Sequence, residues 1–209
     1  ALMRLFAIVP AAGLSRRMGQ PKLVMDLLGK PVVQRLLETL AQPEVVATAI
    51  VMRKSDKDLQ RIVASLKALA VLPGVDPPDM RASVEHGLAA IEEQFHPDPE
   101  DGWLLIPADH PTLDASTFRD LIRHWGNSNA DVLIPRHAGR RGHPAFLRWN
   151  LAAQIPTIPR EQGINWLLSR SNLHIEHVEV DSDSVLLDLD TPADFDDAKR
   201  NLAIRKARK

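Results

Sequence analysis

The most chemically suggestive part of the chain is a turn of small and basic residues close to its start. Residues 10–22 follow directly on an apolar run at 5–9 that predicts a buried strand. Backbone N–H groups freed by a glycine-containing turn can converge on an anion, and Arg16, Arg17 and Lys22 add full positive charge. The turn therefore predicts an anion site, with a polyphosphate as its ligand.

The spacing within this turn excludes two common phosphate loops. A P-loop has four residues between its glycines and a lysine directly after the second one. Here five residues separate Gly13 from Gly19, and Lys22 comes after two more. A dinucleotide-binding fingerprint requires a second glycine where this chain has Ser15.

Two aspartates also follow apolar runs. Asp109 comes after 103–106, and Asp190 lies at a predicted junction between a strand and a helix. Each could simply cap a turn or a helix. If both meet at one edge of the fold, about 4 Å apart, they repel by about 4 kcal/mol at an effective dielectric constant near 20. A divalent cation removes that cost, and oxygen ligands beside phosphates favour Mg²⁺.

Two further segments are candidates for binding substrates. Residues 136–146 place arginines between glycines, which predicts a basic loop that grips a second anion or covers the site, or else a solvated turn. Ser83 lies near the start of a predicted helix, as a nucleotide contact or as an ordinary helix residue. The histidines other than His143 have no metal-ligand spacing, and we interpret them as surface or packing residues.

The elements that must position these residues alternate along the chain. Strands are predicted at 5–9, 45–52, 71–72, 103–106, 131–135 and 174–180. Helices are predicted at 32–40, 55–69, 82–95, 149–154 and 161–169. A further helix follows Asp114 and ends at residue 125. The last helix begins at Pro192, with Thr191 as its N-cap. Such alternation favours an α/β fold with a mainly parallel sheet, whose ligands bind at the carboxyl ends of its strands.

Composition narrows the class of protein. The 209 residues, 44% of them hydrophobic, predict a single domain over 1–209. A net charge of −1 and the absence of a long apolar run give no reason to expect nucleic acid or a membrane as partner. The absence of cysteine excludes disulfides, thiol catalysis and thiolate metal sites. A secretory signal pattern is missing, so we expect a cytoplasmic protein.

Four separate motifs together resemble one family. They lie at residues 10–22, 107–111, 139–146 and 188–194. The chain is similar to the small nucleotidyltransferases that attach a nucleotide to the molybdenum cofactor, especially the cytidylyltransferase branch and its MobA-like relatives. Their first motif begins with leucine, where this chain has Pro10. The resemblance implies a Rossmann-like three-layer fold of the nucleotide-diphospho-sugar transferase type.

The resemblance also implies roles for individual residues. The residues expected to bind the nucleotide are Ala11, Ala12, Gly13, Ser15, Arg17, Lys22 and Ser83. Asp109 and Asp190 are expected to bind Mg²⁺. The residues expected to bind the acceptor are Arg141, Gly142, His143 and Pro144. Arg17, Lys22 and Asp109 are the expected catalytic residues. The Ala-Ala-Gly sequence accompanies CTP in this family, whereas residues 77–82 depart from its usual Gly-Met and serine-rich stretch, which bears on the identity of the base.

The expected reaction is Mg²⁺-dependent transfer of CMP, or another nucleoside monophosphate, from the triphosphate to phosphorylated molybdopterin, with release of pyrophosphate. One alternative is the same transfer to a sugar phosphate or another phosphorylated metabolite. A second is a non-catalytic chaperone that holds molybdopterin for insertion into a molybdenum enzyme. A carrier has no need of a metal pair, so the presence of both Asp109 and Asp190 argues against the chaperone.

Overall fold

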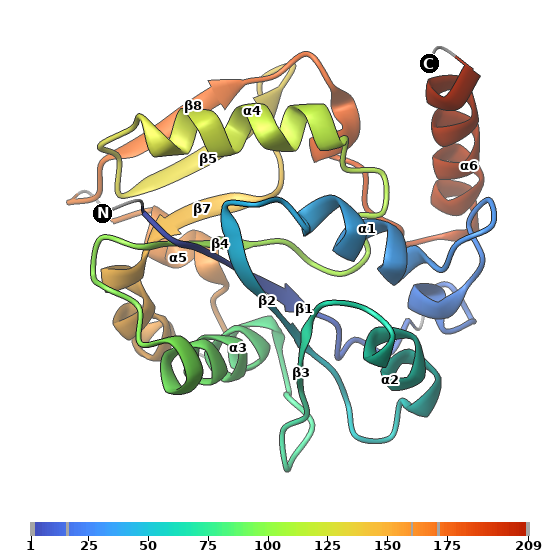
Figure 1. Ribbon diagram of the computed structural model, residues 1–209, viewed down its shortest axis with the longest axis horizontal. Helices are drawn as coiled ribbons and strands as arrows, with labels where there is room; N and C mark the ends of the chain where they lie inside the picture. The colour runs from blue at the N-terminus through green and yellow to red at the C-terminus, as the bar shows by residue number, and fades with distance from the viewer. Residues whose placement is uncertain (1–2, 16, 160, 171, 208–209) are drawn as a thin grey trace.

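The computed structural model describes residues 3–15, 17–159, 161–170 and 172–207. Helices cover both faces of a twisted sheet, so that the chain forms three layers (Figure 1). Among the residues described, no helix has the length and apolar composition needed to cross a bilayer.

The sheet is mainly parallel, as predicted. Its strands are β1 (Leu5–Pro10), β2 (Val45–Val51), β3 (Leu69–Val71), β4 (Gly102–Leu105), β5 (Val132–His137), β6 (Arg140–Arg141), β7 (Ala145–Arg148) and β8 (Ile175–Glu179). They lie in the order β3-β2-β1-β4-β7-β5-β6, and β8 also pairs with β5. β7 runs antiparallel to β4 and β5, and β6 antiparallel to β5, while the remaining pairs are parallel.

The helices alternate with these strands. They are α1 (Val32–Leu40), α2 (Lys57–Ala64), α3 (Met80–Phe95), α4 (Ala115–Gly126), α5 (Ile164–Leu168) and α6 (Pro192–Ala207). Short 3-10 segments are η1 (Lys22–Val24), η2 (Trp149–Thr157) and η3 (Asp183–Val185).

The central strand β1 is buried on both faces, which explains its unbroken apolar sequence. Leu5, Ala7 and Val9 belong to the core that includes α1, α2 and α4. Phe6 and Ile8 alternate with them and belong to the core that includes α3, η2 and α5. A strand fixed on both sides holds the loop at its carboxyl end in a defined place.

Helix α6 begins as predicted. Thr191 caps it, because the backbone N–H of Asp194 donates to Thr191 Oγ1 at 3.3 Å. The Asp194 carboxylate accepts in return from the backbone N–H groups of Thr191, at 2.6 Å, and of Asp190, at 3.0 Å. This reciprocal cap satisfies donors at the helix start and fixes the backbone of Asp190.

Several predicted elements differ from the structure. The helix predicted at 55–69 spans only Lys57–Ala64, since Leu69 pairs with Ala49 as part of β3. The helix predicted at 149–154 is the 3-10 segment η2, where Pro156 lacks an N–H for α-helical bonding. The helix predicted at 161–169 shortens to α5.

Two strand assignments also need correction. β7 was not predicted, because four residues between two neighbouring strands are too few to show a period. No strand precedes Asp190: residues 187–190 have no regular structure. The apolar residue before it, Leu189, is buried in the core instead.

Gly87 allows α3 to pack closely on the sheet, and this packing can be tested. A Cβ added there would lie 2.8 Å from Ile8 Cγ2 and 3.3 Å from Val51 Cγ2. Overpacking of this kind costs about 1–3 kcal/mol, more than the gain of about 1 kcal/mol in helix propensity. We expect Gly87→Ala to lower the free energy of unfolding by about 1 kcal/mol.

The matched control is Gly126→Ala in α4, where an added Cβ meets nothing within 4 Å. That variant should be neutral or more stable by up to about 1 kcal/mol. Urea unfolding of both variants gives the comparison. A stabilised Gly87→Ala would show that the sheet and α3 are not in close contact.

Candidate functional site

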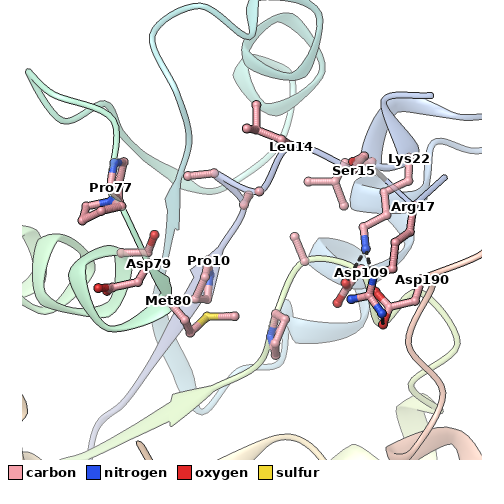
Figure 2. Close-up of a pocket in the computed structure, with 18 residues that line it drawn as sticks. Pro10, Leu14, Ser15, Arg17, Lys22, Pro77, Asp79, Met80, Asp109 and Asp190 are labelled. Carbon is pink, nitrogen blue, oxygen red and sulfur yellow. Dashed lines mark hydrogen bonds and ion pairs between the residues drawn. The ribbon is translucent and has the colours of Figure 1, made fainter. Parts of the chain in front are cut away.

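A cavity of about 550 Å³ opens beyond the carboxyl ends of β1 and β4. Every residue predicted to bind nucleotide or metal lines it: Ala11, Ala12, Gly13, Ser15, Arg17, Lys22, Ser83, Asp109 and Asp190. Arg16, expected to add charge, lies outside the described residues. Figure 2 shows Arg17, Lys22, Asp109 and Asp190 together on one side, and the start of α3, with Asp79 and Met80, opposite them.

The charged side of the cavity is organised around the ammonium group of Lys22. Lys22 Nζ donates to Asp109 Oδ2 at 2.7 Å and to the carbonyl oxygen of Leu189 at 2.5 Å. It lies 3.4 Å from Asp190 Oδ1. Arg17 Nη1 pairs with the other oxygen of Asp190 at 2.9 Å. Three segments that are far apart in the sequence therefore meet at one amine.

Backbone hydrogen bonds explain why the two aspartates converge. The N–H of Ala108 donates to Pro10 O at 3.0 Å, which holds the Asp109 loop beside the end of β1. The N–H of Leu189 donates to Asp109 O at 3.0 Å, which holds the Asp190 segment beside that loop. The predicted convergence is thus present, although a bridging backbone contact produces it, rather than two strands ending at one edge.

The charge balance differs from the prediction. A divalent cation was expected to offset repulsion between Asp109 and Asp190, but Lys22 and Arg17 already pair with these carboxylates. Burial raises the pKa of Asp109, yet the hydrogen bond and charge of His110 and those of Lys22 outweigh it. The pKa falls from 3.8 to about 2.

The donor set is nevertheless suited to a hard cation. The described residues contain no group of three or more His, Cys, Asp or Glu side chains placed to hold a metal. Mg²⁺ commonly binds one or two protein carboxylates and completes its shell with water and substrate phosphates. Asp109 and Asp190, which both face the cavity, match that requirement with oxygen ligands alone.

The opposite wall of the cavity is formed by residues before and within α3. Pro77, Pro78, Asp79 and Met80 line it together with Ser83, which is buried. The Asp79 side chain accepts from the N–H of Ala82 at 2.8 Å and so caps α3. The sequence analysis treated residues 77–80 only as a departure from a motif. The capping aspartate was the signal that could have placed them at a helix start.

A second cavity, of about 380 Å³, adjoins the first and shares Met80 and Pro107 with it. Arg141, Gly142 and His143 line this cavity, as does Asn165 of α5. The rest of its lining is apolar: Leu105, Ile134, Ala145, Ile164 and Leu168. Pro144, also predicted to face an acceptor, is buried and is not part of this lining.

The loop beside this cavity is fixed by close backbone contacts. A Cβ on Gly142 would lie 2.5 Å from Val185 O, so only glycine fits. The N–H of His143 donates to the same oxygen at 2.8 Å. Burial, followed by the charge of His110, lowers the pKa of His143 to about 4, so its ring is neutral at pH 7.

His110 is more closely involved than the sequence analysis anticipated. It is a packing residue, as one of the two interpretations held, and only 4% of it is exposed. Its Nδ1 lies 3.1 Å from Asp109 Oδ1, and its ring packs edge-to-face on His143 with centroids 4.8 Å apart. Its place next to Asp109 in the sequence was the available signal.

Comparison with known proteins agrees with this architecture. A family model described as a MobA-like NTP transferase domain matches residues 7–178. The chain is 25% identical to the molybdenum cofactor cytidylyltransferase of Escherichia coli, over 92% of this chain and 94% of that protein. It is 33% identical to bifunctional protein GlmU of Leifsonia xyli over 68% of this chain. It is 35% identical to 2-C-methyl-D-erythritol 4-phosphate cytidylyltransferase of Halorhodospira halophila over 63% of this chain.

The chain matches only part of two of these relatives, 29% of the GlmU protein and 56% of the Halorhodospira protein. Among solved structures, a protein of Mycobacterium tuberculosis superposes with a TM-score of 0.80 at 20% identity, over 96% of this chain and 99% of that one. The same M. tuberculosis protein in complex with manganese gives a TM-score of 0.75 at 20% identity, over 95% of this chain and 99% of that one. At this identity the likeness establishes the fold.

The ammonium of Lys22, with 14% of its side chain exposed, makes a test of the site electrostatics possible. Asp109 stabilises the folded protein above pH 3.8, because its folded pKa is the lower one, and this contribution disappears as the pH falls towards about 2. Lys22→Met raises that pKa and removes the part of the contribution that Lys22 supplies, while the interactions of His110 remain. We expect a loss of about 2–3 kcal/mol in the free energy of unfolding at pH 7, which narrows as the pH falls to about 2.

Lys30→Met is the matched control, because Lys30 pairs with Glu38 on the surface with 46% of its side chain exposed. It should cost less than about 1 kcal/mol. Urea unfolding between pH 2.5 and 7 supplies both curves. A Lys22→Met deficit that stays constant over this range would contradict the assigned ion pair.

Proposed function

Because the chain belongs to the MobA-like NTP transferase family, we propose that it transfers CMP from CTP to the phosphate of molybdopterin and releases pyrophosphate. The observation that carries this proposal is the meeting of Lys22, Asp109 and Asp190 beside the small-residue loop that follows β1. Cations, carboxylates and the backbone of a small-residue loop in one cavity suit a triphosphate and a divalent cation.

The second cavity supports an acceptor with an apolar body. It adjoins the first cavity across Met80 and Pro107, so the two substrates would lie side by side. Arg141 provides a cation for a phosphate, and the apolar lining suits a flat ring system. The relative matched over nearly its whole length is a molybdenum cofactor cytidylyltransferase, which favours molybdopterin.

The reaction requires little proton transfer. An oxygen of the acceptor phosphate, already an anion near pH 7, attacks the α-phosphorus of the triphosphate. As that P–O bond forms, the bond between the α-phosphorus and its bridging oxygen breaks, and pyrophosphate leaves with the electron pair. Catalysis then depends on positioning and on charge neutralisation.

The chain's own residues have distinct tasks in this scheme. Arg17, with 73% of its side chain exposed, is free to turn from Asp190 towards the phosphates. Lys22 keeps the two carboxylates together at the end of the β1 loop. Asp109 and Asp190 would hold Mg²⁺, which when bound supplies Lewis-acid stabilisation of phosphate charge.

A second candidate acceptor comes from the 35% identical relative, a 2-C-methyl-D-erythritol 4-phosphate cytidylyltransferase. The same machinery would then act on a phosphorylated polyol, and a sugar phosphate belongs to the same class. The chaperone alternative leaves the charged cluster of the first cavity without a task, so we place it last.

Release of pyrophosphate distinguishes these possibilities. The protein is assayed with CTP, GTP, ATP or UTP and Mg²⁺, alone and with molybdopterin, 2-C-methyl-D-erythritol 4-phosphate or a sugar phosphate. We expect release from CTP only with molybdopterin present. Release with another acceptor identifies that acceptor instead, and tight molybdopterin binding without release from any nucleotide indicates the chaperone.

Asp109→Asn tests the carboxylate cluster. The amide keeps the shape of the side chain but removes its charge, so we expect kcat to fall at least about 100-fold while the circular dichroism spectrum is unchanged. The matched control is Asp120→Asn, because Asp120 pairs with Arg123 on the exposed face of α4, away from the cavity. Turnover of Asp109→Asn equal to that of the control would exclude a catalytic role for Asp109.

A further inference from the structure

His110 lies between the two cavities and contacts a residue of each. Its Nδ1 is 3.1 Å from Oδ1 of Asp109, which lines the first cavity. Its ring packs on the ring of His143, which lines the second, with an interplanar angle of 74°. The side chain is buried, so these contacts are made without competition from bulk water.

The hydrogen bond between His110 and Asp109 has a defined direction. The Asp109 carboxylate pairs with the ammonium of Lys22, and a carboxylate only accepts hydrogen bonds. His110 Nδ1 therefore carries the hydrogen and donates it. The second oxygen of Asp109 accepts from Lys22 at 2.7 Å. Two donors on different elements thus fix the rotation of one carboxylate.

The contact with His143 fixes the second cavity in a related way. In the described part of the chain, Nδ1 of His143 is buried and has no hydrogen-bond partner. Packing against His110 therefore helps to hold this ring in place, together with a hydrogen bond between the ring and the Leu105 backbone.

We propose that His110 is a positioning residue that couples the two cavities. Its Nδ1–H directs the Asp109 carboxylate towards the divalent cation and the triphosphate, and its ring sets the place of His143 beside the acceptor. The inference rests on the proposed function, because the two cavities are taken as the sites of nucleotide and acceptor. In-line transfer between two bound substrates loses rate steeply when either one is displaced by about 1 Å.

Two substitutions separate the two contacts. His110→Asn keeps a donor close to the place of Nδ1 but removes the ring that packs on His143. His110→Phe keeps a ring of similar size but removes the donor. His124→Phe is the matched control, since His124 is 43% exposed and pairs with Glu176.

The first measurement is of metal binding, which does not require the enzyme to turn over. Mn²⁺ is titrated into each variant in the presence of CTP, and free Mn²⁺ is counted by electron paramagnetic resonance. We expect His110→Phe to weaken Mn²⁺ binding about tenfold or more, and His110→Asn to stay within about threefold of the unsubstituted protein. Equal Mn²⁺ affinity in His110→Phe and the unsubstituted protein would overturn the inference, as would an unsubstituted protein that binds no Mn²⁺.

Steady-state kinetics give the second readout. His110→Phe should lower kcat about 10- to 100-fold with little change in the KM for the acceptor, whereas His110→Asn should raise that KM several-fold and keep most of kcat. A merely structural role predicts lowered thermal stability in both variants and no such division, which would contradict the coupling. Failure of the unsubstituted protein to transfer CMP to any acceptor counts against the proposed function alone, because the Mn²⁺ titration still decides the position of Asp109.

Discussion

The site depends on one largely buried amine. Lys22 Nζ is held by Asp109, by the carbonyl oxygen of Leu189 and by Asp190, and it joins the loop after β1 to two later segments of the chain. A half-neutralised cluster of this kind would be costly, because a buried charge without a partner destabilises a fold by several kcal/mol. The cluster is balanced since Arg17 meets the remaining oxygen of Asp190. Both carboxylates still line a cavity, where a cation and phosphates can meet them.

The sheet makes this balance possible by fixing the backbone on which it rests. β1 is buried on both faces, and the carbonyl oxygen of its last residue, Pro10, accepts a hydrogen bond from the Asp109 loop. The Asp109 loop in turn accepts from Leu189, and the capping residue Asp194 holds the Asp190 backbone. Each link is a short-range contact, yet together they bring charges from both ends of the chain to within a few ångströms.

The loop that carries Asp109 and His110 lies between two cavities with different linings. One is lined by charge and by small residues, and the other is largely apolar with Arg141, His143 and Asn165 as its polar groups. Residues shared by both walls place them side by side, as a reaction between two bound substrates requires. At this boundary His110 is buried and contacts both Asp109 and His143.

The sequence by itself determined the α/β class, most of the strands and helices, and the residues on the charged side of the first cavity, because apolar period, capping residues and short motifs are local properties. Thr191 and Pro192 marked the start of α6 correctly, whereas β7 and the short end of α2 were missed since pairing with distant strands decided them. The tertiary structure alone decided that Lys22 lies between Asp109 and Asp190 in place of an expected repulsion, and that His110 contacts both cavities. Charge partners and ring contacts between distant segments depend on how the chain is brought together, and no local pattern carries that information.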